Sequence, residues 1–130
     1  LTEGLNCEIT NVLLSLQAYF VIVEDEQPVC DVQYRSDQLK QLAAYDIVVT
    51  SKGSQCDFVS RYLWPANGGD EDPVTGSIHA GLAPYWALEL GIASLGAYQA
   101  SARGGVLCCE GKEDCVNVSG DGELYMKGKI

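Results

Sequence analysis

The stretch Gly68-Gly69-Asp70-Glu71-Asp72-Pro73-Val74-Thr75-Gly76-Ser77-Ile78-His79 decides how this chain is organised. It joins an expected strand to an expected helix through a glycine-rich loop and three carboxylates. The first amides of a helix have no partner within the helix, and the helix dipole makes that end locally positive. Such an end binds a carboxylate or another anion. We therefore expect an anion site where this helix begins.

Four residues of this stretch are candidate ligand contacts. Gly76 has no side chain, so a ligand can approach the backbone closely, and Thr75 and Ser77 offer hydroxyl groups. Asp72 precedes the free amides and can either cap the helix or hydrogen-bond a polar group of a ligand. In the alternative, purely structural interpretation, the stretch is only a helix cap and a solvated acidic loop.

Hydrophobic patterning predicts the elements on both sides of the stretch. A helix is expected over residues 76–90, with Gly91 just beyond its end. Strands are expected at 19–23, 29–34, 47–50, 57–64, 95–99, 105–109, 116–119 and 124–127, and a short helix at 37–44. A hairpin turn at Gly120-Asp121-Gly122 is expected to join the last two strands. Strands on both sides of one main helix indicate a mixed α/β or α+β domain.

Length and charge restrict the class of protein. The 130 residues predict a single domain, 1–130, and the balance of 47% hydrophobic and 20% charged residues is typical of a globular one. The net charge of −10 argues against a general binder of nucleic acid or anionic membranes, because either needs a basic face. The apolar stretches are far shorter than the roughly 20 residues that span a bilayer.

The six cysteines do not require a disulfide framework in a chain of this length, and they include no C-x-x-C pair. With a single histidine, a zinc site is not expected either. We interpret the cysteines as reduced, mostly buried thiols of a cytosolic, and so cytoplasmic, protein.

Three residues outside the four candidates can each be interpreted as structural or as part of a ligand site. His79 is expected to be a packed or hydrogen-bonded core residue, although it lies one turn into the helix. Arg61 on its strand can pair with Glu71, or it can reach a ligand. Arg103 either belongs to a simple bend between strands or faces a ligand cleft.

Four motifs follow one another along the chain, namely Arg61-Tyr62-Leu63-Trp64-Pro65, Glu71-Asp72-Pro73-Val74-Thr75-Gly76-Ser77, Leu82-Ala83-Pro84-Tyr85-Trp86 and Gln99-Ala100-Ser101-Ala102-Arg103-Gly104-Gly105. Their residues, order and spacing resemble the phenazine-biosynthesis (PhzF-like) isomerase family. The match is close between residues 46 and 107 and looser on both sides.

The resemblance implies an α+β, diaminopimelate-epimerase-like fold, in which each of two halves is a curved, mostly antiparallel sheet wrapped around a central helix. It implies an isomerase that moves a proton on a small carboxylate substrate, with no metal or organic cofactor. Carried onto this sequence, the catalytic residue is Asp72, which with Ser77 would hold and polarise the substrate. Gly76 and the helix amides, with Thr75 beside them, would bind its carboxylate.

The chain matches only the second, C-terminal half of such a protein. The first-half segment with the acid/base glutamate is not in the sequence, and Glu8 does not stand in a recognisable copy of it. We therefore expect the chain to begin partway through a larger protein. Two functions remain in view. One is half of an isomerase that needs the missing N-terminal half. The other is a non-catalytic module that pairs with a second copy or a partner and retains only the carboxylate-binding helix start.

Overall fold

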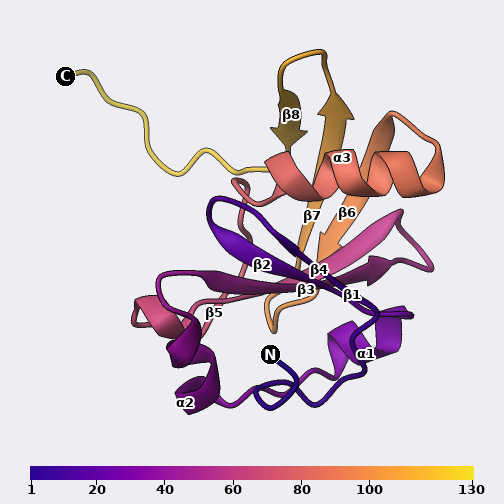
Figure 1. Ribbon diagram of the computed structural model, residues 1–130. Helices are drawn as coiled ribbons and strands as arrows, with labels where there is room; N and C mark the ends of the chain where they lie inside the picture. The colour runs from indigo at the N-terminus through magenta and orange to yellow at the C-terminus, as the bar shows by residue number, and fades with distance from the viewer.

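The computed structural model describes all 130 residues and contains one eight-stranded sheet (Figure 1). The strands are β1 (Asn11–Leu14), β2 (Ala18–Ile22), β3 (Asp46–Lys52), β4 (Phe58–Leu63), β5 (Glu71–Asp72), β6 (Ser94–Gln99), β7 (Gly105–Gly111) and β8 (Val116–Ser119). Their order is β1-β2-β3-β4-β6-β7-β8, and β5 also pairs with β4. Only β2–β3 and β4–β6 are parallel, so the sheet is open and mostly antiparallel. The predicted mixture of helix and antiparallel sheet is confirmed.

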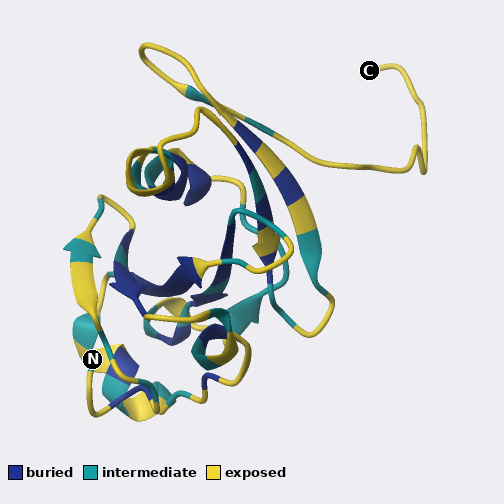
Figure 2. Cartoon of the chain, turned by 90° about the vertical axis from the view of Figure 1, so that its right-hand side faces the viewer, coloured by how far each residue is buried: buried dark blue, intermediate teal, exposed yellow.

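The helix α3 (His79–Leu90) lies against the hollow face of the curved sheet, with its buried side turned towards the strands (Figure 2). Leu82 and Trp86 from this helix pack with side chains of β2, β3, β4, β6 and β7 in the larger of two hydrophobic clusters. In β4, Phe58 and Tyr62 belong to this cluster, whereas Val59 belongs to the cluster on the other face. Residues of β4 therefore point alternately to the two faces of the sheet, and the strand predicted at 57–64 is confirmed.

The opposite face of the sheet is covered by α1 (Glu26–Cys30), α2 (Ser36–Leu39) and the short 3₁₀ helices η1 (Lys40–Leu42) and η2 (Pro65–Asn67). Arg61 of β4 connects this layer to the sheet. Its guanidinium donates two hydrogen bonds to the Glu71 carboxylate, at 2.7 and 2.8 Å. It also donates at 2.9 Å to the carbonyl of Val32, which follows α1 in the chain. The pairing of Arg61 with Glu71 is confirmed. The Arg61 guanidinium makes its hydrogen bonds within the fold.

The boundaries of α3 differ from the prediction at one end only. The helix begins at His79, three residues after Gly76, and ends as expected before Gly91, whose left-handed φ of 69° suits glycine. Residues 76–78 form the turn that leads into it.

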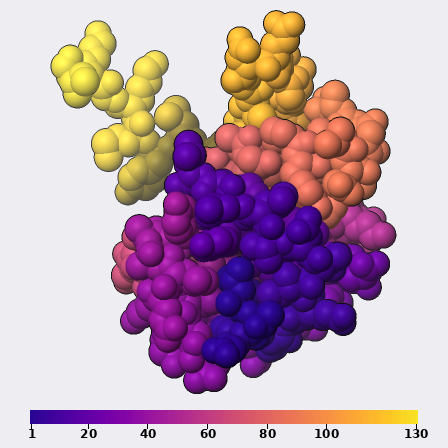
Figure 3. All heavy atoms as spheres, viewed as in Figure 1, coloured from indigo at the N-terminus to yellow at the C-terminus, as the bar shows by residue number.

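Two predicted strands are wrong. Residues 29–34 contain the end of α1 rather than a strand, because Val29 and Val32, three residues apart, both enter the same hydrophobic cluster. Residues 120–130 form neither the expected hairpin turn nor a strand, and their chain stands away from the body (Figure 3). Leu124 and Tyr125 are 82% and 94% exposed, so no apolar surface of the chain stabilises a strand there. The exposed strand β1 was not predicted.

All six cysteines are free thiols, but only Cys109 is buried, so the expectation of mostly buried thiols is wrong. Cys109 faces the core, while its neighbour Cys108 is exposed on the other side of β7. Most of the others lie in loops or at the ends of elements, which stay at the surface. None of the helices combines the length and the apolar content needed to cross a bilayer.

The Arg61 contacts lead to a stability prediction. Arg61→Ala should lower the free energy of unfolding by about 2–4 kcal/mol, because it leaves the half-buried Glu71 carboxylate and the Val32 carbonyl unpaired. Urea denaturation followed by tryptophan fluorescence measures this. Arg35→Ala is the matched control: its ion pair with Asp37 is largely exposed, and its loss should change stability by less than about 1 kcal/mol. Equal losses in the two variants would contradict the assigned role of Arg61.

Candidate active site

The segment Asp72–Ser77 runs from β5 to the turn before α3, so its two ends are held by different parts of the fold. At one end, β5 pairs with β4 in a register that sets Asp72 opposite Tyr62. At the other end, Ile78 is buried in the core. The segment is therefore anchored on both sides, while Gly76 and Ser77 remain exposed.

The Asp72 carboxylate is half-buried, and its Oδ2 accepts a hydrogen bond from the Thr75 hydroxyl. No hydrogen bond within the chain reaches Oδ1. Asp72 does not cap α3: the N-cap position is Ile78, and no side chain hydrogen-bonds the helix start. The interpretation of the segment as a helix cap is therefore wrong. The carboxylate is held in place and keeps one oxygen available.

The backbone N–H groups of Gly76, Ser77 and Ile78 donate no hydrogen bond within the chain. Their carbonyls do accept hydrogen bonds. The Gly76 carbonyl accepts from the His79 N–H at 3.0 Å, and the Ser77 carbonyl accepts from the Ala80 N–H at 3.3 Å. A Cβ built on Gly76 would meet nothing within 4 Å, so the space above this backbone is open. Unpaired amides at the start of a helix attract an anion, and at Gly76 one can reach them.

A buried layer of polar side chains supports the segment from below. The side-chain oxygen of Gln99 in β6 accepts the N–H of Thr75 at 2.8 Å, and its Nε2 donates to the carbonyl of Asp72 at 2.9 Å. His79 Nδ1 lies 2.7 Å from the Thr75 carbonyl and donates to it, so this nitrogen carries the proton. Ser101 donates to the carbonyl of Pro73 at 2.8 Å.

His79 is fully buried, which confirms that it is a hydrogen-bonded core residue. Its ring lies beside that of Phe58, with 5.8 Å between the centroids. Burial lowers the pKa of this histidine from its ordinary value, with the hydrogen bond to the Thr75 carbonyl opposing. The neutral ring therefore leaves Nε2 as an acceptor, and this atom has no partner.

The four candidates identified in the sequence thus lie in one short segment, and the structure joins Asp72 directly to Thr75. The Ser77 side chain is exposed and makes no hydrogen bond within the chain. Glu8 lies elsewhere, in a recess beside α1 with Gln27 and Asp31. The sequence analysis did not identify Gln99 as a residue of the site. The available signal was its amide side chain, which stands at an inward-facing position of the strand β6.

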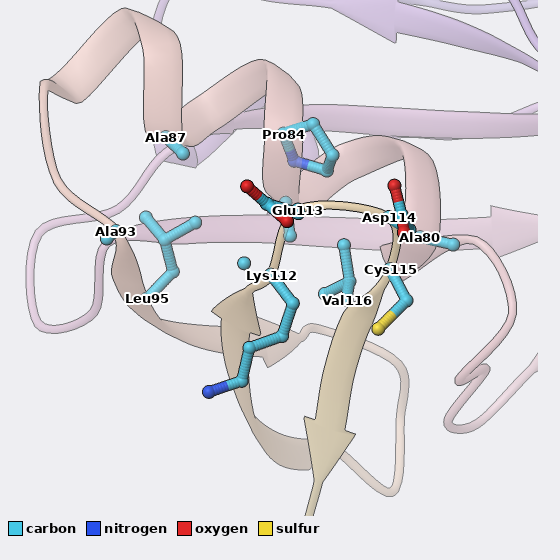
Figure 4. A pocket seen from close by; sticks show the side chains of 12 residues that line it. Ala80, Pro84, Ala87, Ala93, Leu95, Lys112, Glu113, Asp114, Cys115 and Val116 are labelled. Atoms are coloured by element: carbon cyan, nitrogen blue, oxygen red, sulfur yellow. The ribbon is translucent and has the colours of Figure 1, made fainter.

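Arg103 is exposed and lines a recess of about 620 Å³ with Tyr34, Asp70, Pro73 and Ser101. This recess borders the candidate segment at Pro73 but does not include Asp72 or Gly76. Another recess, of about 400 Å³, lies between α3 and the β7–β8 hairpin, where the small side chains of Ala80, Pro84 and Ala87 leave space (Figure 4). Neither hollow is lined by Asp72, Thr75, Gly76 or Ser77.

The sequence matches the model of one known protein family. The model described as "Phenazine biosynthesis-like protein" (PhzC-PhzF) matches residues 6–128 of this chain. The chain belongs to the PhzF-like family.

Other PhzF-like proteins are similar to this chain over nearly all of its length. An uncharacterized isomerase of Pseudomonas aeruginosa, PA3578, is 42% identical over 130 residues, which is 100% of this chain and 50% of that protein. A second, PA2770 of the same organism, is 42% identical over 118 residues, 91% of this chain and 46% of that protein. The crystal structure of an Enterococcus faecalis PhzF family protein has a TM-score of 0.89 and 39% identity, covering 97% of this chain and 48% of that one. The chain thus spans about half the length of the proteins it matches.

The buried histidine leads to a prediction about pH. Its folded-state pKa lies below its unfolded value, so between these values the unfolded chain binds more protons. Stability should therefore fall as pH drops below about 6.5, with a slope of at most about 1.4 kcal/mol per pH unit from this group. His79→Asn, whose amide can still donate to the Thr75 carbonyl, should flatten this dependence in denaturation experiments between pH 7.5 and 5. Because His79 is the only histidine, an unchanged slope would contradict the assignment.

Proposed function

We propose that this chain provides the second half of the active site of an isomerase that moves a proton on a small carboxylate substrate, by isomerisation or epimerisation. The observation that carries the proposal is the placement of a held carboxylate, Asp72, next to three unpaired amides at the start of α3. The two Pseudomonas relatives, both named as uncharacterized isomerases, support the same class of reaction.

The substrate carboxylate would bind at Gly76 and Ser77. Their amides donate, the Ser77 hydroxyl adds a donor, and the dipole of α3 favours a negative charge. Hydrogen bonds to an ionised group are roughly twice as strong as neutral ones. This arrangement lets a chain with a net charge of −10 bind an anion, because the attraction comes from local backbone groups.

Asp72 would hold and polarise the substrate next to the carbon that loses or gains the proton. Its Oδ2 is engaged by Thr75, so Oδ1 is the atom that can accept a hydrogen bond or a proton from the substrate. The PhzF-like resemblance assigns the main acid/base glutamate to the other half, which would face Asp72 across a cleft between two diaminopimelate-epimerase-like halves. We also propose that the reaction needs no cofactor, which rests on the resemblance. A cytoplasmic location is proposed from the free cysteine thiols.

The proposal is tested by proton exchange in heavy water. The chain is mixed with the first-half segment of PA3578 and with small cyclic and amino-acid-like carboxylates, and deuterium incorporation into the carboxylates is followed by NMR. Asp72→Asn should reduce the exchange rate by about 10²–10⁴-fold, the usual contribution of a positioned acid/base group. Asp70→Asn, an exposed carboxylate two residues away, is the control and should stay within about threefold of the wild type. No exchange in the completed protein with any of these carboxylates would overturn the proposal.

Carboxylate binding is tested separately at Gly76. Gly76→Val should fold as the wild type does, because a Cβ there meets nothing within 4 Å, but it should block access to the amides. We expect at least a tenfold loss of affinity for anthranilate, an aromatic carboxylate, by isothermal titration calorimetry. Gly122→Val places the same side chain at another open glycine, in the exposed tail, and should leave the affinity unchanged. Unaltered binding in Gly76→Val would remove the helix start from the proposed site.

Exposed apolar side chains favour a second candidate, a non-catalytic module that pairs with a second copy or with a partner. Leu14 on the edge strand β1 is 57% exposed and Tyr125 in the tail is 94% exposed, so both offer surface that association would bury. Sedimentation equilibrium distinguishes the candidates. A dimer that binds anthranilate without proton exchange would support the module, and a clean monomer at high concentration would count against it.

A further inference from the structure

Gln99 is a fully buried amide in the last position of β6, directly beneath the candidate segment. Both ends of its side chain are used. Its oxygen accepts the Thr75 N–H at 2.8 Å, and its Nε2 donates to the Asp72 carbonyl at 2.9 Å and to the Thr75 Oγ1 at 3.2 Å. This one side chain therefore binds both the first and the fourth residue of the segment from Asp72 to Thr75.

The direction of these hydrogen bonds determines where the Thr75 hydroxyl proton goes. An amide nitrogen can only donate, so Thr75 Oγ1 is the acceptor in its contact with Gln99 Nε2. The hydroxyl proton of Thr75 is then free for Asp72 Oδ2, and the structure has that bond. His79 holds the Thr75 carbonyl at 2.7 Å from the other side, so the residue cannot turn away.

Gln99 is in turn fixed by the sheet. It lies opposite Ser60 in the parallel pairing of β4 with β6, and the next residue, Ala100, donates to the Ser60 carbonyl at 2.8 Å. A buried side chain whose polar atoms are all engaged keeps a single orientation, because any other would leave buried groups unpaired. A rigid strand thus sets the geometry of an exposed segment.

We propose that Gln99 is a positioning residue that aims the Thr75 hydroxyl at Asp72 and thereby sets the orientation of the Asp72 carboxylate. The inference rests on the proposed function of Asp72. Gln99 itself is too deeply buried to touch a substrate.

Gln99→Glu tests this at nearly constant shape. The substitution keeps an acceptor for the Thr75 N–H but replaces the donating amide with a second acceptor, which competes with Asp72 for the Thr75 hydroxyl proton. In the completed protein we expect kcat for proton exchange to fall by about 10–100-fold with KM nearly unchanged, since Gly76 and Ser77 still bind the carboxylate.

Thr75→Val and Thr75→Ser test the same role of the Thr75 hydroxyl independently of Gln99. Thr75→Val keeps the backbone bond to Gln99 but removes the hydroxyl, and it should reproduce the lower kcat with KM nearly unchanged. Thr75→Ser restores the hydroxyl and should restore kcat. Thr50→Val is the matched control for lost stability. Thr50 is equally buried, donates to the Val59 carbonyl at 2.6 Å and accepts from Trp86 at 3.0 Å, but it has no contact with the segment. Its loss should destabilise the protein and leave kcat and KM for proton exchange unchanged.

A readout without turnover separates this inference from the proposed function. The ¹³C chemical shift of the Asp72 carboxyl group is measured by NMR at one fixed pH in the chain alone, without any first half. Gln99→Glu and Thr75→Val should both change this chemical shift, because each takes the Thr75 hydroxyl donor away from Asp72, whereas Thr50→Val should not. If the wild-type protein shows no proton exchange but the chemical shift changes in both variants, the proposed function fails and the positioning role stands. If the chemical shift does not change in Gln99→Glu or in Thr75→Val, the positioning role is overturned whatever the activity.

Discussion

The burial of one helix in the hollow of the sheet is the constraint on which the rest of this structure depends. Trp86 of α3 stacks on Phe58 of β4, with 6.2 Å between ring centroids and 14° between the ring planes, and its indole nitrogen donates to Thr50 of β3. An aromatic pair of this kind contributes about 0.5–1.5 kcal/mol beyond the area it buries, and the indole hydrogen bond avoids an unpaired buried donor. Helix and sheet are therefore joined at a defined position, and Ile78, buried in the same hydrophobic cluster, fixes where the helix begins.

The position of the helix start determines the chemistry available at the surface. Residues 76–78 follow Thr75, which binds Asp72 and Gln99, so the free amides come directly after the residue that holds the carboxylate. Two buried polar residues, Gln99 and His79, hold the loop from below. The hydrophobic effect positions the helix, and directional hydrogen bonds then refine the placement of a carboxylate.

The candidate site faces open space in this chain, which spans about half the length of the relatives it matches. A catalytic site needs groups on more than one side of its substrate and must exclude water from it. Asp72 and the amides of Gly76 and Ser77 lie on a single surface. That surface fits the proposed division of an active site between two halves, one binding the carboxylate and the other bringing the main acid/base group.

The sequence by itself determined the elements whose signals are local and strong. The strand β4 and the end of α3 at Gly91 follow from residue spacing, and the structure agrees. Only the tertiary structure decided that residues 29–34 include the end of α1, since Val29 and Val32 follow the demands of a shared core. It also decided that Asp72 binds Thr75 rather than capping the helix, and that Gln99, 27 residues away along the chain, binds them both. These contacts depend on the packing of distant strands, which residue spacing within a short stretch does not contain.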